Sequence, residues 1–321
     1  MSPRIIVVAP STEVGVIARE MAPAGFELVL AYSSAELEPV LGAAEYMVCY
    51  PHVRMGDAFY RAAPRLKLVQ LLSAGYDAVD LEAARRAKVP VTNNGGANAV
   101  SVAEHTLMLM LTVSRKLVWQ HANVAGGRWR GNGPPPRMYE LFDKTLGIVG
   151  LGTIGKKVAR LAQAFGMRVQ YCDIVRLSED AEDALGVRFR LLRELLKSSD
   201  VVSLHVPLNA STRHLIGAGE IALMKPSAML INTSRGPVVD EPALARALTD
   251  GKLLGAGLDV FDREPPPADN ALFALDNVVL TAHFAGPTWD NHLARFRNAF
   301  DNVQRVHRGE RPLWVVPELA G

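Results

Sequence analysis

The sequence has few of the features that mark secreted or membrane proteins. Its 321 residues include only two cysteines, Cys49 and Cys172, and both lie in short apolar runs, so we expect buried free thiols in a reducing compartment. No apolar stretch reaches the length of about 18 residues that a membrane-spanning helix needs. The first apolar run already ends at Pro10, which predicts a first strand rather than a signal peptide. We therefore expect a cytoplasmic protein.

An excess of charge of one sign is also absent. Lysine and arginine total 35, aspartate and glutamate total 33, and no run of five basic residues occurs, so nothing predicts a nucleic-acid partner. Hydrophobic residues make up 49% of the chain and charged residues 21%, which is ordinary for a globular protein. At roughly 150 residues per domain, the length predicts two domains.

Short apolar runs alternate with amphipathic segments along most of the chain, which predicts two doubly wound parallel sheets of the α/β class. Between the two series we expect an apolar helix over 101–117 and a Gly/Pro-rich loop over 125–138. The tail from about 290 predicts one amphipathic helix that crosses back to cover the first unit. The strands expected in the first series are 4–10, 26–31, 46–51, 66–73 and 89–93, and those in the second are 144–150, 168–173, 200–207, 228–232, 253–260 and 277–283.

A glycine motif, GLGTIG at 150–155, follows the first strand of the second series and opens a helix. That context favours a dinucleotide site. Gly150 allows the tight turn, Gly152 lets the backbone approach a pyrophosphate, and Gly155 lets helix and strand pack closely.

The residues around this motif indicate which dinucleotide binds. Thr153 and Ile154 at the start of the helix offer free N–H groups to the phosphates. The next strand ends in Asp173, whose carboxylate can bind both ribose hydroxyls and would repel a 2′-phosphate. We therefore predict NAD, with NADH preferred over NADPH. Arg176 close by is the one residue that argues the other way.

Three strands of the second series lead to residues whose side chains can take part in a reaction: Arg235, Glu264 and His283. The carboxyl ends of parallel strands share one sheet edge, so these side chains can converge. Arginine can bind a carboxylate, histidine can exchange a proton near neutrality, and a glutamate on the other ring nitrogen would fix the histidine tautomer. Together they fit reversible oxidation of an alcohol beside an acid group. Taken singly, each has a plainer explanation: a surface arginine, a solvated loop acid and a hydrogen-bonded structural histidine.

The motifs GLGTIG, INTSRGPVVDEPAL, GLDVFDREPP, TAHFAG, LLSAGYDAVD and NAVSVAEHTL make the sequence resemble the D-isomer-specific 2-hydroxyacid dehydrogenase family over most of its length. The resemblance implies that Arg235, Glu264 and His283 are the catalytic set and that Asp259 contacts the nicotinamide amide. It implies that backbone N–H groups of Ala74 and Gly75 join Arg235 and His283 in binding the substrate. Further implied cofactor-binding residues are His205, Val206, Pro207, Thr212, Thr233 and Ser234.

The resemblance also implies a layout and a set of partners. A Rossmann NAD-binding domain over 99–287 would be inserted into a flavodoxin-like substrate domain made of 1–98 and 288–321. The helix at 101–117 and the loop around Trp129 are similar to the family's dimerisation elements, so we expect a homodimer. No His/Cys/Asp cluster has metal-ligand spacing, so we expect no metal.

Several readings of the activity stay open. A small 2-keto acid of the glyoxylate or hydroxypyruvate class is favoured, reduced with NADH and with His283 as general acid. A D-3-phosphoglycerate dehydrogenase without a regulatory domain is an alternative, in which Arg128 and Arg130 would serve a second anionic group. Formate- and phosphite-type relatives fit less well, because Glu264 and Ala74 depart from their patterns. From another class, an NAD-binding corepressor-like scaffold remains an alternative.

Overall fold

The computed structural model describes residues 2–320, which form two compact units. Unit 1 runs to Asn98 and resumes at Pro287, while unit 2 runs from Ala99 to Gly286. Unit 2 is thus inserted into unit 1. Within residues 2–320, no helix combines the length and the apolar character that a membrane span requires.

Unit 1 contains a five-stranded parallel sheet with the strand order β2-β1-β3-β4-β5. This order reverses direction between β1 and β3, as in the flavodoxin-like arrangement. The elements of unit 1 are β1 (Arg4–Val8), α1 (Thr12–Met21), β2 (Glu27–Ala31), α2 (Ser34–Leu37), η1 (Glu38–Ala43), β3 (Tyr46–Cys49), α3 (Asp57–Ala62), β4 (Leu68–Leu71), α4 (Leu81–Ala87), β5 (Val91–Thr92), α12 (Trp289–His307) and η4 (Pro317–Leu319).

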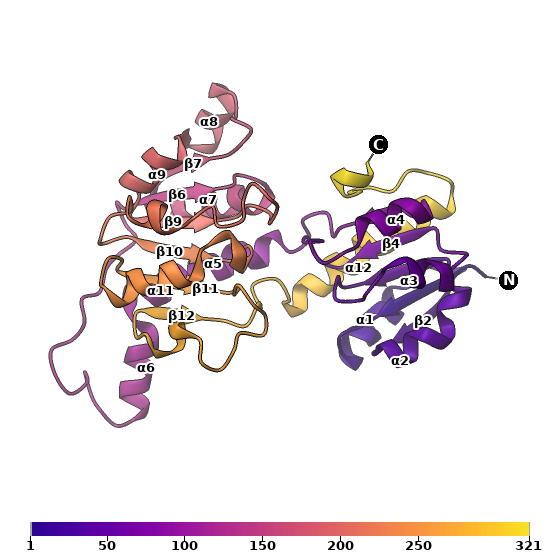
Figure 1. Ribbon diagram of the computed structural model, residues 1–321, viewed down its shortest axis with the longest axis horizontal. Coiled ribbons are helices and arrows are strands. Elements are labelled where there is room, and N and C mark those ends of the chain that lie inside the picture. The colour runs from indigo at the N-terminus through magenta and orange to yellow at the C-terminus, as the bar shows by residue number, and fades with distance from the viewer. Residues whose placement is uncertain (1, 321) are drawn as a thin grey trace. The chain divides into compact units, whose positions relative to one another are not determined.

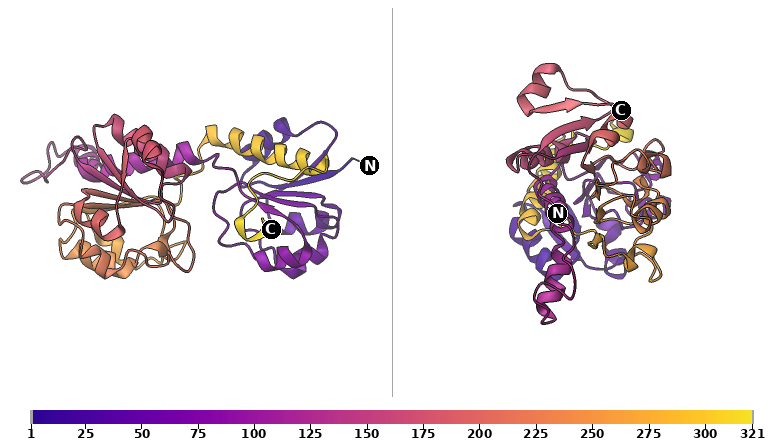
Figure 2. Two further views of the ribbon diagram at one scale, coloured as in Figure 1. Left: turned by 90° about the horizontal axis from the view of Figure 1, so that it is seen from above. Right: turned by 90° about the vertical axis from the view of Figure 1, so that its left-hand side faces the viewer.

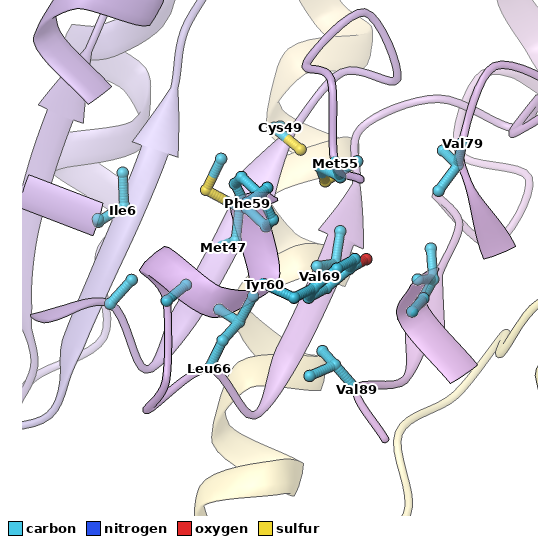
Figure 3. Close-up of a cluster of buried hydrophobic side chains, with 14 of the residues drawn as sticks. Ile6, Met47, Cys49, Met55, Phe59, Tyr60, Leu66, Val69, Val79 and Val89 are labelled. Carbon is cyan, nitrogen blue, oxygen red and sulfur yellow. The ribbon is translucent and has the colours of Figure 1, made fainter. Parts of the chain in front are cut away.

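Helices cover both faces of this sheet (Figure 2), which is why the middle strand, β3, is buried along its whole length. On one face, α1 and α12 pack against the strands, with Phe296 fully buried. On the other face, α3 and α4 enclose a second cluster that includes Met47, Phe59 and Tyr60 (Figure 3). Cys49 is a free thiol inside this cluster, and burial raises its pKa to about 12.

Unit 2 contains a seven-stranded parallel sheet with the order β12-β11-β10-β9-β6-β7-β8, visible along the sheet in Figure 1. Its elements are α5 (Ala99–Arg115), α6 (Leu117–Ala125), β6 (Thr145–Val149), α7 (Thr153–Ala164), β7 (Arg168–Cys172), α8 (Glu179–Leu185), β8 (Val187–Phe189), α9 (Leu192–Ser198), β9 (Val201–Leu204), α10 (Ala218–Ile221), β10 (Met229–Asn232), η2 (Gly236–Val238), α11 (Glu241–Thr249), β11 (Gly255–Leu258), η3 (Ala271–Ala274) and β12 (Val278–Leu280).

The strand order of unit 2 identifies where a ligand should bind. Helices α5 and α7 cover one face of the sheet, and α9, α10 and α11 cover the other. The chain winds outward in both directions from β6 and β9, as in Rossmann sheets. The predicted fold class, two doubly wound parallel sheets, is confirmed. The loops after β6 and β9 meet at the switch point, where the His205 N–H donates to the carbonyl of Val149 at 2.8 Å.

Two local predictions differ from the structure. The single helix expected over 101–117 is α5, which ends at Arg115, followed by a separate helix α6. The two helices are separate because the backbone of Lys116 is left-handed, with φ 52°, and does not continue a right-handed helix. The sequence analysis also missed β8, which has only three residues and therefore gives almost no periodic signal.

Candidate active site

The glycine loop after β6 has three glycines with three different surroundings. Gly150 has φ 95°, and a Cβ atom there would lie 2.9 Å from the His205 backbone. A Cβ atom on Gly155 would lie 2.3 Å from the carbonyl oxygen of Gly150. On Gly152, by contrast, a Cβ atom would meet nothing within 4 Å. Gly150 and Gly155 are therefore required by packing, whereas Gly152 keeps space open above the loop.

The start of α7 is suited to an anion. Gly152 is the N-cap and provides no side-chain cap to the first turn, where Thr153 and Ile154 stand. Uncapped N–H groups at the start of a helix of 12 residues attract phosphate. The open space at Gly152 and the uncapped N–H groups together fit the pyrophosphate of a dinucleotide.

Asp173 lies beside this loop, at the end of β7. Its Oδ2 accepts the N–H of Leu151 at 2.7 Å, and its Oδ1 accepts the N–H of Val175 at 3.1 Å. The nearby Arg176 is engaged elsewhere, because its Nε donates to the buried Glu182 at 3.0 Å. The arginine that argued for a 2′-phosphate is thus already paired.

A tight turn after β10 presents Arg235. The side chain of Asn232 holds this turn, since its Oδ1 accepts the N–H of Ser234 at 3.0 Å and its Nδ2 donates to the carbonyl of Arg235 at 2.9 Å. Gly236 must be glycine, because a Cβ atom there would lie 1.8 Å from the carbonyl oxygen of Phe261. The same close approach brings the Phe261–Glu264 loop beside Arg235.

His283 and Glu264 form a hydrogen-bonded pair, with Nδ1 and Oε2 separated by 2.7 Å. The other carboxylate oxygen, Oε1, accepts the N–H of Phe261 at 3.1 Å. Burial raises the pKa of Glu264, but the hydrogen bond and charge of His283, the Phe261 N–H and the charge of Arg235 lower it further, so the net shift is downward. Arg235, Glu264 and His283 therefore come together within unit 2.

The lowered pKa of Glu264 determines the histidine tautomer. An ionised carboxylate has no proton to donate, so Nδ1 of His283 carries the hydrogen in this bond. The remaining ring nitrogen, Nε2, is then the atom that can take or give a proton. The pair is partly exposed, with side-chain exposures of 46% for His283 and 37% for Glu264, so a substrate can reach it.

The turn that carries His283 is built around Asp259. The Asp259 carbonyl accepts the N–H of His283 at 2.7 Å, and its carboxylate accepts the N–H groups of Phe284 and Ala285, each at 2.9 Å. Asp259 has no solvent-accessible surface. These contacts make Asp259 a support for the turn of His283, and the nicotinamide contact that the resemblance implies for it stays a prediction.

The other predicted cofactor residues lie on the same sheet edge, and most have local partners. The Thr212 hydroxyl donates to the carbonyl of Pro207 at 2.6 Å, and Thr233 Oγ1 lies 3.0 Å from Thr106 Oγ1. Nε2 of His205 lies 2.9 Å from Ser203 Oγ, and burial lowers the pKa of His205 to about 3, so it is neutral at pH 7. Val206 follows His205, and Ser234 donates to Asn232.

Ala74 and Gly75 belong to unit 1, in the loop after β4. Ser73 closes this loop, because its hydroxyl donates to the carbonyl of Gly75 at 2.7 Å. Their part in substrate binding stays a prediction. Among residues 2–320, no group of three or more His, Cys, Asp or Glu side chains is placed to hold a metal ion.

Sequence reasoning missed some residues of the site. Asn232 could have been found, because an asparagine side chain at a strand end commonly accepts the backbone N–H two residues on and so forms a turn. Thr281 had no such signal, yet its hydroxyl donates to Asp259 at 2.6 Å. His105 on α5 gave no such signal either, and its Nε2 lies 2.9 Å from Oγ1 of Thr281.

The model of the D-isomer specific 2-hydroxyacid dehydrogenase NAD binding domain matches residues 107–285, which is more than half of the chain. This chain belongs to the D-isomer specific 2-hydroxyacid dehydrogenase family. It is therefore an NAD-dependent oxidoreductase that transfers a hydride between NAD(H) and a 2-hydroxy or 2-keto acid. The glycine loop and the cluster of Arg235, Glu264 and His283 lie in the same unit.

Individual relatives of the dehydrogenase support the same family. A glyoxylate reductase of Korarchaeum cryptofilum is 42% identical over 255 residues, covering 79% of this chain and 76% of that protein. A glyoxylate reductase of Aeropyrum pernix is 38% identical over 313 residues, covering 92% and 93%.

Solved structures agree over nearly the whole chain. The D-lactate dehydrogenase of Aquifex aeolicus, complexed with NAD and lactic acid, superposes with a TM-score of 0.81 at 32% identity, covering 96% of each chain. An acyclic imino acid reductase in complex with NADPH and D-Arg superposes with a TM-score of 0.82 at 28% identity, covering 98% of this chain and 99% of that chain. The fold alone thus accommodates either dinucleotide.

Proposed function

We propose that this dehydrogenase reduces a small 2-keto acid of the glyoxylate or hydroxypyruvate class with NADH, and that His283 is the general acid. The 2.7 Å pair between His283 and Glu264, beside Arg235, carries this proposal. The glyoxylate reductases of Korarchaeum cryptofilum and Aeropyrum pernix, which match most of the chain, support the choice of substrate class.

Each residue has a definite task in the proposed reaction. Arg235 binds the substrate carboxylate and polarises the adjacent carbonyl oxygen. Glu264 accepts the Nδ1 hydrogen of His283 and stabilises the imidazolium form. Protonated Nε2 of His283 donates to the ketone oxygen during reduction, and neutral Nε2 takes the hydroxyl proton during oxidation. When bound, the nicotinamide provides or accepts the hydride at the same carbon.

The family resemblance also links residues of the loop after β4 to the substrate. We assign the backbone N–H groups of Ala74 and Gly75 to the substrate carboxylate, as the family resemblance implies. A phosphorylated substrate is less well supported, because Arg128 is occupied within its own loop. Its Nε donates to Asn123 at 2.9 Å, and its Nη2 donates to the carbonyl of Ala122 at 3.3 Å.

NADH is the proposed cofactor in preference to NADPH. Asp173 stands at the end of β7 with its carboxylate at the glycine loop, and Arg176 is held by Glu182. A 2′-phosphate would therefore meet the carboxylate of Asp173, whereas Nε of Arg176 points to Glu182. We expect kcat/KM of the unchanged enzyme to be higher with NADH than with NADPH. Asp173→Ala should reduce the ratio of these two values. A clear preference for NADPH in the unchanged enzyme would overturn this assignment.

We further propose that the enzyme is a cytoplasmic homodimer. Several large apolar side chains of α6 and the following loop are exposed, among them Leu117, Val118, Val124 and Trp129, the last at 79%. Several large apolar side chains exposed within one short stretch of chain are typical of a protein interface. Both cysteines are free, which fits a reducing compartment. Sedimentation of Val118→Asp and Val124→Asp should show dissociation to monomers.

A panel of 2-keto acids, each tested for oxidation of NADH, is the deciding experiment. Glyoxylate or hydroxypyruvate should give the highest kcat/KM, and His283→Ala should lower kcat by a factor on the order of 10² or more. Substitution of Arg19, an exposed residue on α1 to which no role is assigned, provides the control. Unchanged turnover in His283→Ala would refute the assigned chemistry.

A further inference from the structure

A chain of hydrogen bonds connects helix α5 to the turn that carries His283. Nε2 of His105 lies 2.9 Å from Oγ1 of Thr281, and that hydroxyl donates to Oδ1 of Asp259 at 2.6 Å. The same Oδ1 accepts the N–H of Phe284 at 2.9 Å. Three segments of unit 2, namely α5, the end of β11 and the stretch after β12, thus meet at the turn that carries the general acid.

The direction of each bond in this chain can be deduced. A hydroxyl has one hydrogen, and that of Thr281 goes to the carboxylate of Asp259. The Thr281 oxygen therefore accepts from His105, so Nε2 of His105 carries a hydrogen. The side chain of His105 is 14% exposed, and Nε2 also lies 3.5 Å from Oδ1 of Asp259. His105 thereby orients the hydroxyl and places a donor beside a fully buried carboxylate.

The backbone at His283 needs such support. Its φ angle is 58°, a left-handed conformation that residues other than glycine seldom adopt. The bonds from His283 N–H to the Asp259 carbonyl and from Phe284 and Ala285 to the Asp259 carboxylate hold the turn in this shape. A shift of Asp259 would move all three anchor points together.

We propose that His105 and Thr281 are positioning residues for the reaction, acting through Asp259 to hold His283 in its left-handed turn. Neither side chain touches the Glu264–His283 bond itself. The inference rests on the proposed role of His283, since it explains how that imidazole is kept in place. It assigns a function to His105, a partly buried histidine of α5 that has no task in the proposed reaction.

The test compares variants that remove one hydrogen bond with variants that keep it. Thr281→Val has nearly the same shape as threonine but lacks the hydroxyl, whereas Thr281→Ser retains it. His105→Leu removes the donor, whereas His105→Gln can present an N–H to Thr281. We expect kcat for keto-acid reduction to fall about tenfold or more in Thr281→Val and His105→Leu, because small displacements of a reacting group are costly. Thr281→Ser and His105→Gln should recover most of the activity, and NADH affinity should change less than twofold.

A double-mutant cycle separates positioning from general stability. In a His283→Ala background, Thr281→Val and His105→Leu should have no further effect on the residual kcat, since the residue they position is gone. An equal fold-loss with and without His283, or full activity of both single variants, would overturn the inference. If Thr281→Val does not fold, as judged by circular dichroism, His105→Leu decides the matter, because it leaves the Thr281–Asp259 bond intact. Full activity of His283→Ala alone would instead refute the proposed function.

Discussion

Glu264 is hydrogen-bonded to His283 through one carboxylate oxygen and to the backbone of its own loop through the other. Oε2 lies 2.7 Å from Nδ1 of the imidazole, while Oε1 accepts the N–H of Phe261 at 3.1 Å. With both oxygens engaged, the carboxylate cannot rotate without losing a bond. The imidazole is thus fixed in orientation and tautomer before a substrate arrives.

Glu264→Gln should therefore impair turnover while leaving substrate binding largely intact. The glutamine amide can donate to Nδ1 and so permit the other tautomer, in which Nε2 already carries the hydrogen and cannot act as a base. We expect kcat for hydroxy-acid oxidation to fall by a factor on the order of 10² or more. Steady-state kinetics in both directions measures this, with the exposed Glu179→Gln as control. A higher KM for the hydroxy acid with an unchanged kcat would contradict the assigned role.

The glycine loop gives a prediction that separates binding from folding. Gly152→Ala adds a methyl group where nothing lies within 4 Å, so the melting temperature should stay within about 2 °C of the unchanged enzyme. The same methyl group fills the space proposed for the pyrophosphate, so NADH should bind at least tenfold more weakly.

Gly155→Ala is the matched contrast, because its methyl group would lie 2.3 Å from the carbonyl oxygen of Gly150. This variant should lose roughly 1–3 kcal/mol of stability through overpacking. Thermal unfolding and fluorescence titration with NADH distinguish the two cases. Tight NADH binding by Gly152→Ala would show that the dinucleotide does not approach this position.

Asp200 provides a pH-dependent contribution to stability. Burial raises its pKa, but the N–H of Thr145 and the ammonium of Lys225, each 2.9 Å away, lower it below its ordinary value of 3.8. A carboxyl group with a lowered pKa stabilises the fold above its ordinary pKa, and this stabilisation is lost as the pH falls through the folded value.

Asp200→Asn should accordingly lower the unfolding free energy by about 1 kcal/mol at pH 7. The difference from the unchanged enzyme should stay constant between pH 6 and 8 and narrow below about pH 4. Urea unfolding across this range measures it. A difference that widens as the pH falls would show that the carboxylate is destabilising in the folded state.

We expect that Tyr60 can be replaced by phenylalanine without loss of stability. In the described part of the chain its buried hydroxyl has no hydrogen-bond partner, and its ring sits within the apolar cluster of Figure 3. Tyr60→Phe should therefore leave stability unchanged or raise it by up to about 1 kcal/mol. Tyr46→Phe is the control, because its hydroxyl lies 3.2 Å from Nδ1 of His307, and it should cost about 1 kcal/mol. Equal losses of stability in Tyr60→Phe and Tyr46→Phe would contradict this interpretation.

The sequence predicted the sheets well because their strands are short apolar runs, covered by helices on both faces. The glycine loop was equally readable, since Gly150 and Gly155 are fixed by close backbone contacts that no other residue allows. The break at Lys116 escaped notice because lysine has no special preference for a left-handed backbone. Three-residue β8 is too short to show a period.

The site was predictable only in part, for a similar reason. Arg235, Glu264 and His283 follow strands that end at one sheet edge, so their convergence follows from topology. The contacts beneath them do not, because Asp259, Thr281 and His105 come from separate segments and are joined only by tertiary packing. A buried aspartate at a strand end looks the same in sequence whether it faces a ligand or a turn.

The return of α12 to unit 1 has a consequence for synthesis on the ribosome. Phe296, Phe300 and Val303 complete one face of the unit 1 sheet, yet they follow the whole of unit 2 in the chain. Unit 2 can complete its hydrophobic core while this face of the unit 1 sheet is still not covered by α12. The portion of the protein made first should therefore mature last, and during translation it is the part most in need of a chaperone.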